Sequence, residues 1–142
     1  MDKYYFTKSN YAILSYLYCD FLWRLPRSLC RNLNLEESKK YCEKIGIEYS
    51  TSVWDVTSAK EMVSFNPKFL KVPSACNNHF EMLKVLRDGY QGEVHISFGM
   101  TTKSEEEEIV AFFEQTNQAH RLIVYSCTSG YPVLFEDICM LE

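Results

Sequence analysis

The sequence KVPSACNNHF, residues 71–80, lies where a strand-like pattern of residues gives way to a helical one. It begins at the end of FLKV, a short strand-like run, and leads into a helical pattern that starts two residues after Cys76. Lysine and serine at the end of a buried strand allow two interpretations. One is that these residues bind an anionic group there, and the other is that they only mark the end of an ordinary strand.

The same alternation of strand and helix extends along the chain on both sides of this junction. The helical segments carry apolar stripes and end at Gly or Asn-Pro, whereas the strand segments are rich in β-branched and aromatic residues. Strands this apolar favour a parallel sheet covered by helices, for which an open doubly wound sheet and a (β/α)8 barrel both fit. The predicted helices are 35–46, 57–65, 78–89 and 103–117, and the predicted strands are 47–54, 68–72, 93–99 and 121–127.

The start of the last predicted helix carries a capping signal. Thr102 is followed three residues later by Glu105, the spacing of a capping box. The acidic run 105–108 fits the preference of carboxylates for a helix N-terminus, and we interpret it in this way rather than as a metal site.

Composition limits the class of protein. The chain has 142 residues, of which 46% are hydrophobic, so it fits one globular domain. A net charge of −4 without a block of Lys or Arg argues against a nucleic-acid partner. The six cysteines show no CxxC or paired Cys/His spacing, which favours free thiols and a cytoplasmic location. The apolar run 11–25 is too short to cross a bilayer and is interrupted by Asp20, so no membrane partner is expected.

Polar residues gather where each predicted strand ends. Because ligands in parallel α/β folds bind beyond the carboxyl ends of the strands, these residues are the first candidates for a site. Hydroxyls, backbone N–H groups and one fixed cation form a suitable cradle for a phosphate or a carboxylate. The four strand ends carry Thr51-Ser52, Lys71 with Ser74, Ser97-Phe98-Gly99, and Cys127 to Tyr131.

Four ordered motifs resemble those of the sialic acid synthase family. They are GIEYSTSVWD (46–55), FLKVPSACNN (69–78), HISFGMT (95–101) and CTSGYPVLFEDICML (127–141), and the resemblance covers about residues 33–142. It implies a (β/α)8 barrel that condenses phosphoenolpyruvate with N-acetylmannosamine or a related N-acylated amino sugar. The product is a nine-carbon sialic-type acid, phosphate is released, and a divalent metal, commonly Mn or Mg, takes part.

The resemblance also implies roles for individual residues. Lys71 would hold the anionic phosphoenolpyruvate, and serine hydroxyls would donate hydrogen bonds to its phosphate. Cys76 stands where many members of the family have an acidic residue, which makes it a candidate catalytic group, a subgroup variant or a packing residue. The implied substrate-binding residues are Ser52, Lys71, Ser74, Ser97, Ser129 and Tyr131, and the implied catalytic residues are Lys71 and Cys76.

Two features depart from the family. Residues 1–32 lack its opening motifs, and we interpret them as a leader that is helical, before a barrel domain at 33–142. The histidines that bind the family's metal are not recognisable, so we predict no metal ligands in this chain. Of the three histidines, His95 shares the parity of Ser97 along its strand and is expected to point into the barrel interior.

Because a full barrel needs about 250 residues, this chain is expected to supply about four strand–helix units of a partial TIM barrel. We predict a synthase-like fragment that is inactive alone. The alternatives are a non-catalytic phosphate- or sugar-phosphate-binding module and a non-functional gene fragment. Unpaired edges of the sheet also predict self-association.

Overall fold

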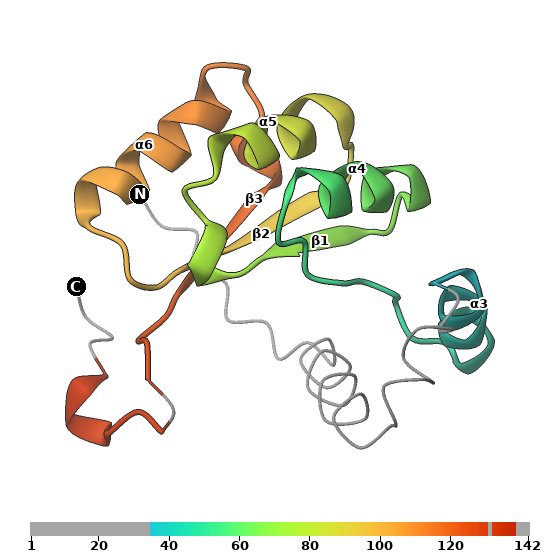
Figure 1. The fold of residues 1–142 in the computed structure, drawn as a ribbon, viewed down its shortest axis with the longest axis horizontal. Coiled ribbons are helices and arrows are strands. Elements are labelled where there is room, and N and C mark those ends of the chain that lie inside the picture. The colour runs from blue at the N-terminus through green and yellow to red at the C-terminus, as the bar shows by residue number, and fades with distance from the viewer. Residues whose placement is uncertain (1–34, 131, 139–142) are drawn as a thin grey trace. The chain divides into compact units, whose positions relative to one another are not determined.

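The computed structural model describes residues 35–130 and 132–138, so the predicted leader and Tyr131 lie outside the described residues. Two compact units make up the chain, Met1–Tyr49 and Ser50–Glu142. In chain order the elements are α3 (Leu35–Ile45), α4 (Val56–Phe65), β1 (Phe69–Val72), η1 (Ser74–Cys76), α5 (Phe80–Gly89), β2 (Glu93–Phe98), α6 (Lys103–Glu114), η2 (Ala119–Arg121), β3 (Leu122–Ser126) and η3 (Phe135–Asp137) (Figure 1).

The described part of the first unit is the helix α3 and the chain that follows it. Cys42 of this helix is buried. The helix ends as the sequence predicts, because Gly46 adopts a φ of +74°, which favours glycine. The backbone N–H of Ile47 then donates to the carbonyl of Cys42 at 2.9 Å and satisfies one of the last carbonyls of the helix.

The second unit is built on a three-stranded parallel sheet in the order β1-β2-β3. The register pairs Lys71 with His95 and His95 with Ile123. The predicted strand 47–54 is reduced to an isolated parallel bridge between Ser52 and Lys71. Two backbone hydrogen bonds, made by residues 51, 53 and 71, hold this bridge, too few to count as a regular strand.

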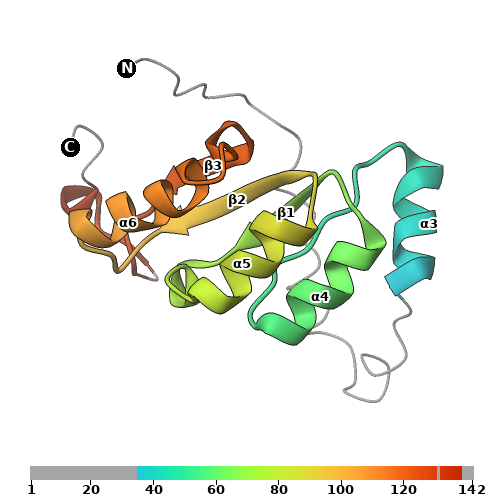
Figure 2. The same ribbon diagram turned by 90° about the horizontal axis from the view of Figure 1, so that it is seen from above.

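Helices α4, α5 and α6 all lie on one side of this sheet (Figures 1 and 2). Alternate strand residues point toward them and are buried, and so are the apolar residues of the helices that cover the sheet. A doubly wound sheet would carry helices on both faces and a reversal in strand order. The strands follow chain order and these helices share one face, so the arrangement is that of a partial barrel. The fully buried core includes Leu70, Val72, Leu83, Leu86, Val94, Ile96, Ile109 and Phe113.

Helices α4 and α6 each begin with a capping box. At α6, Thr102 accepts from the backbone N–H of Glu105, whose carboxylate accepts from the backbone N–H of Thr102 at 2.7 Å. This is the predicted cap. At α4, Asp55 and Ser58 form an equivalent box, and Asn66 ends the helix with a left-handed φ of 46°. These caps fix where the chain turns from strand end to helix.

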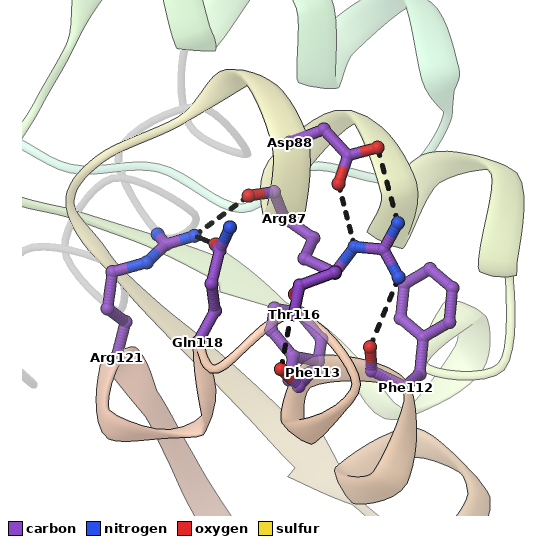
Figure 3. A network of polar contacts seen from close by, with 7 residues as sticks. All are labelled: Arg87, Asp88, Phe112, Phe113, Thr116, Gln118 and Arg121. Atoms are coloured by element: carbon purple, nitrogen blue, oxygen red, sulfur yellow. Dashed lines mark hydrogen bonds and ion pairs between the residues drawn. The ribbon is translucent and has the colours of Figure 1, made fainter.

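Two arginines fasten the end of the sheet at which the strands begin (Figure 3). Arg121 is buried, and its guanidinium donates to the carbonyls of Gly92 and Arg87 at 2.6 and 3.0 Å and to the side-chain oxygen of Gln118. Arg87 donates to the carbonyl of Phe112 and lies 4.0 Å from the centre of that ring. These contacts tie α5, α6 and η2 together, away from the strand ends where a site is expected.

Within the described ranges, no helix is both long enough and apolar enough to cross a membrane.

Candidate functional site

Lys71 lies on β1 and projects from the sheet face opposite to the helices. Its neighbours Leu70 and Val72 are fully buried toward the helices, so the alternation of the strand sends the lysine to the other side. The ammonium donates to the carbonyl of Val72 at 3.0 Å and to the hydroxyl of Ser97. No carboxylate of the described residues forms an ion pair with it. Half-buried and without a counter-ion from residues 35–130 and 132–138, this cation is suited to an anionic ligand.

Burial governs the ionisation of this lysine. It lowers the pKa of the Lys71 ammonium, whereas the nearby thiols of Cys127 and Cys76 act in the opposite direction. Loss of water is the largest influence, because hydration stabilises the charged form more than the neutral amine.

Ser97, near the end of β2, accepts the hydrogen bond from the Lys71 ammonium. A lysine ammonium has no acceptor, so the bond from its nitrogen leaves the hydroxyl proton of Ser97 free to donate to another group. The backbone near Ser97 is held by Asn77, a buried residue whose side-chain N–H donates to the carbonyl of Ser97 at 2.9 Å. Asn77 thus joins the turn after β1 to the end of β2.

Ser74 and Ser129 come together around Gly99. A Cβ built on Gly99 would lie 2.6 Å from the hydroxyl oxygen of Ser74 and 2.9 Å from that of Ser129. Real Cβ atoms do not approach other heavy atoms so closely, so only glycine allows both hydroxyls to lie here without moving. Two predicted hydroxyls from separate loops therefore lie beside one backbone position that follows β2.

Ser52 lies next to Lys71 in the isolated bridge. Residues paired in parallel strands project to the same face, so Ser52 shares the face of the lysine. The predicted residues Ser52, Lys71, Ser74, Ser97 and Ser129 are thus gathered at the carboxyl ends of neighbouring strands. Their roles toward a substrate stay predictions.

Cys76 is half-buried in η1, close to Lys71. Its thiol lies 3.7 Å from the carbonyls of Val53 and Pro73. Burial raises the pKa of this thiol, the ammonium of Lys71 lowers it, and Asp55 raises it. The net pKa is above the usual value, so Cys76 is a protonated thiol at neutral pH. In this state it can donate a proton, but it is not a thiolate nucleophile.

His95 and Tyr125 occupy the same face below the strand ends. The Nδ1 atom of His95 lies 2.7 Å from the hydroxyl of Tyr125, and its Nε2 atom lies 3.2 Å from a carboxylate oxygen of Glu93. The inward orientation predicted for His95 from its parity is confirmed. The ring centre of Tyr125 lies 5.2 Å from the nitrogen of Lys71.

Sequence reasoning missed Asn77 and Tyr125. Asn77 is one of several polar residues in a loop, and its hydrogen bond to a strand 20 residues away has no local signal. Tyr125 had a usable signal, because it shares the parity of Cys127 on a strand whose end was already a candidate.

The divalent metal implied by the resemblance is not matched by the residues at hand. In residues 35–130 and 132–138 no group of three or more His, Cys, Asp or Glu side chains is placed to hold a metal ion.

The fold and the site together define a parallel α/β protein of the barrel type, with a cation and several hydroxyls at the carboxyl rim of its sheet. A family model described as the NeuB family matches residues 28–142, and the chain belongs to this family. The sequence resemblance to the sialic acid synthases is thereby confirmed at the level of the family.

Two relatives are similar to this chain over about the same length. One is the N-acetylneuraminate-9-phosphate synthase of Drosophila melanogaster, 26% identical over 102 residues that cover 72% of this chain. The other is the uncharacterized protein MJ1065 of Methanocaldococcus jannaschii, 31% identical over 103 residues, again 72% of this chain. The matched segment spans 27% of the first relative and 30% of the second.

Proposed function

We propose that this chain contributes the phosphoenolpyruvate-binding rim of a sialic acid synthase-type barrel. The observation that carries the proposal is the half-buried Lys71 ammonium, which has no carboxylate partner in the described chain and is bonded to a serine hydroxyl. Membership of the NeuB family and the similarity to the N-acetylneuraminate-9-phosphate synthase of Drosophila melanogaster support a synthase reaction.

In this proposal Lys71 binds the negative charge of phosphoenolpyruvate and the hydroxyls bind its oxygens. Ser97 has a proton to donate because its oxygen already accepts from Lys71. Ser74 and Ser129 lie beside Gly99, where they add two more neutral donors. Charge-assisted hydrogen bonds of this type are about twice as strong as neutral ones, and a preformed set also stabilises charge on a departing phosphate.

The reaction itself is taken from the family resemblance. We propose condensation of phosphoenolpyruvate with N-acetylmannosamine or a related N-acylated amino sugar, with release of phosphate. Tyr131 would line the sugar side and Cys76 is a candidate proton donor. The Mn or Mg ion implied by the resemblance would be bound by groups other than the residues that the structure describes.

Calorimetry with phosphoenolpyruvate tests the anion site. Lys71→Ala removes the cation, and we expect a loss of affinity of at least tenfold, the equivalent of one charge-assisted hydrogen bond of about 1.5–3 kcal/mol. Lys84→Ala is the control, because Lys84 is an exposed lysine on α5. Equal affinity of the wild type and Lys71→Ala would remove the proposal.

A phosphate-release assay separates an enzyme from a binding module. The chain is incubated with phosphoenolpyruvate, manganese and a panel of N-acylated hexosamines. Release that depends on both the sugar and Lys71 supports a synthase. Binding without release supports the non-catalytic phosphate- or sugar-phosphate-binding module.

A further inference from the structure

To bind an anion, the ammonium of Lys71 must be held in place by groups that do not neutralise its charge. A carboxylate partner would hold the ammonium, but it would also compete with an anionic ligand for it. In the described chain the lysine is held instead by two oxygen acceptors, the carbonyl of Val72 and the hydroxyl of Ser97. Both are uncharged, so the full positive charge stays available.

The aromatic ring of Tyr125 provides a third contact of the same kind. The nitrogen of Lys71 lies over this ring, 5.2 Å from its centre. The face of an aromatic ring carries partial negative charge and attracts a cation within about 6 Å. A ring attracts the ammonium, yet it brings no net charge that would repel an anion.

Two further residues fix the position of that ring. Glu93 is a carboxylate that can only accept a hydrogen bond, so the Nε2 atom of His95, 3.2 Å away, carries the proton. Burial lowers the pKa of His95, which keeps the imidazole neutral and leaves Nδ1 as an acceptor. The hydroxyl of Tyr125 then donates to Nδ1 at 2.7 Å. Phe69 packs against the imidazole, with ring centres 4.5 Å apart.

We propose that Tyr125 is a positioning residue for Lys71, and that His95 and Glu93 hold Tyr125 in the orientation that places its ring beneath the ammonium. The proposal rests on the anion-binding role given to Lys71 above. It adds three residues that the predicted site does not contain, of which Tyr125 and Glu93 also lie outside the motifs.

The ionisable groups that face Lys71 come from three places. Cys76 lies on η1 after the lysine's own strand, His95 lies on β2, and Tyr125 and Cys127 lie on and after β3. Burial raises the pKa of the Tyr125 phenol, and Glu93 and Cys127 raise it further, which favours the neutral form of the ring.

The test is the pH profile of Lys71 itself, which needs no bound ligand. The full chain is labelled with trace acetic anhydride between pH 7 and 11, and mass spectrometry follows the acetylation of Lys71 against the exposed Lys84. Tyr125→Leu removes the ring, and we expect the pKa of Lys71 to fall by about half a unit, the size of one cation–π contact. Tyr41→Leu, which removes an exposed tyrosine of α3, should leave the profile unchanged. An unchanged or higher pKa in Tyr125→Leu would overturn the proposal.

A second pair of variants tests the tether while keeping the ring. His95→Leu removes the acceptor for the Tyr125 hydroxyl and should lower the pKa of Lys71 in the same direction as the loss of the ring. His95→Gln keeps a side-chain acceptor and should restore most of the wild-type profile. If both variants match the wild type, His95 has no positioning role, whether or not Tyr125→Leu folds.

The anion site and the positioning residues can fail separately. Absence of phosphoenolpyruvate binding by the wild type would end the proposed function, but the acetylation profiles would still decide whether Tyr125 acts on Lys71. If the wild type binds, Tyr125→Leu should weaken binding several-fold, whereas Tyr41→Leu should not.

Discussion

At the scale of single residues, Gly99 controls how closely Ser74 and Ser129 approach each other. A methyl group at this position would lie 2.6 and 2.9 Å from their two oxygens, so Gly99→Ala must push the serines away. We expect phosphoenolpyruvate affinity to fall by about tenfold in calorimetry, the equivalent of one lost hydrogen bond to a charged group. The fold should survive, because the displaced side chains are small.

Gly89→Ala is the matched control for this substitution. The added methyl group would meet only the side chain of Val63, at an ordinary contact distance of 3.8 Å. Its affinity should equal that of the wild type. A Gly99→Ala protein that binds as tightly as Gly89→Ala would show that the two serines do not act together.

Tyr90 gives a prediction about stability and pH. It is 1% exposed, its hydroxyl donates to the carbonyl of Pro67 at 2.6 Å, and burial raises its pKa from 10.0 to about 12. Between these pH values the unfolded chain loses the phenol proton while the folded chain keeps it, so stability falls as pH rises. Tyr90→Phe should cost about 1 kcal/mol at pH 8. In urea unfolding the difference between the two proteins should shrink by pH 11; an equal difference at both pH values would contradict the assignment.

The individual residues of the site were predictable to different degrees. Lys71 and Ser97 were recognisable because each lies at or near the end of an apolar run and matches a family motif. Their mutual contact was not, because the register that places residue 71 opposite residue 95 is set by long-range pairing. The close approach at Gly99 depends on a loop 30 residues further along the chain, which no local pattern encodes.

At the scale of elements, Arg121 joins η2 to the start of β2 and to the end of α5. Its buried guanidinium donates to the carbonyls of Gly92 and Arg87 and to Gln118. Arg121→Met would leave these acceptors without that donor, and we expect a loss of about 2–4 kcal/mol in the free energy of unfolding. His120→Ala, an exposed neighbour, should change it by less than about 0.5 kcal/mol. Urea denaturation measures the free energy of unfolding of both variants. Similar losses in the two variants would show that the hydrogen bonds of Arg121 do not stabilise the fold.

Helices were predicted more reliably than strands. Their ends carry local signals, such as Thr102 with Glu105 at the start of α6 and Gly46 at the end of α3, and these signals act within one turn. A strand is completed by partners elsewhere in the chain. Residues 47–54 have a strand-like composition, yet the pairing with β1 is limited to the bridge between Ser52 and Lys71.

At the scale of the whole molecule, the sequence did not decide between a doubly wound sheet and a barrel, because both folds alternate strands with helices. The choice depends on which face each helix covers, and a crossover pattern alone does not encode this. In the second unit α4, α5 and α6 share one face (Figure 2). The other face presents polar groups from neighbouring strands, as expected for the interior of a barrel near its rim.

The sheet face opposite the helices and the edge beside it lead to a prediction about assembly. Among the described residues no strand pairs with the outer edge of β3, and Ile123 and Tyr125 on this strand are 38% and 41% exposed. Unpaired edges and exposed apolar residues promote association between chains. We therefore expect the purified 142-residue chain to show concentration-dependent assembly in analytical ultracentrifugation.

Ile123→Lys should shift this assembly toward the monomer, since an inward-pointing charge on an edge strand opposes pairing. Ile45→Lys, an equivalent change at an exposed isoleucine of α3, should not. A wild-type chain that sediments as a single monomer and melts cooperatively would mean that the edge of β3 is protected without another chain.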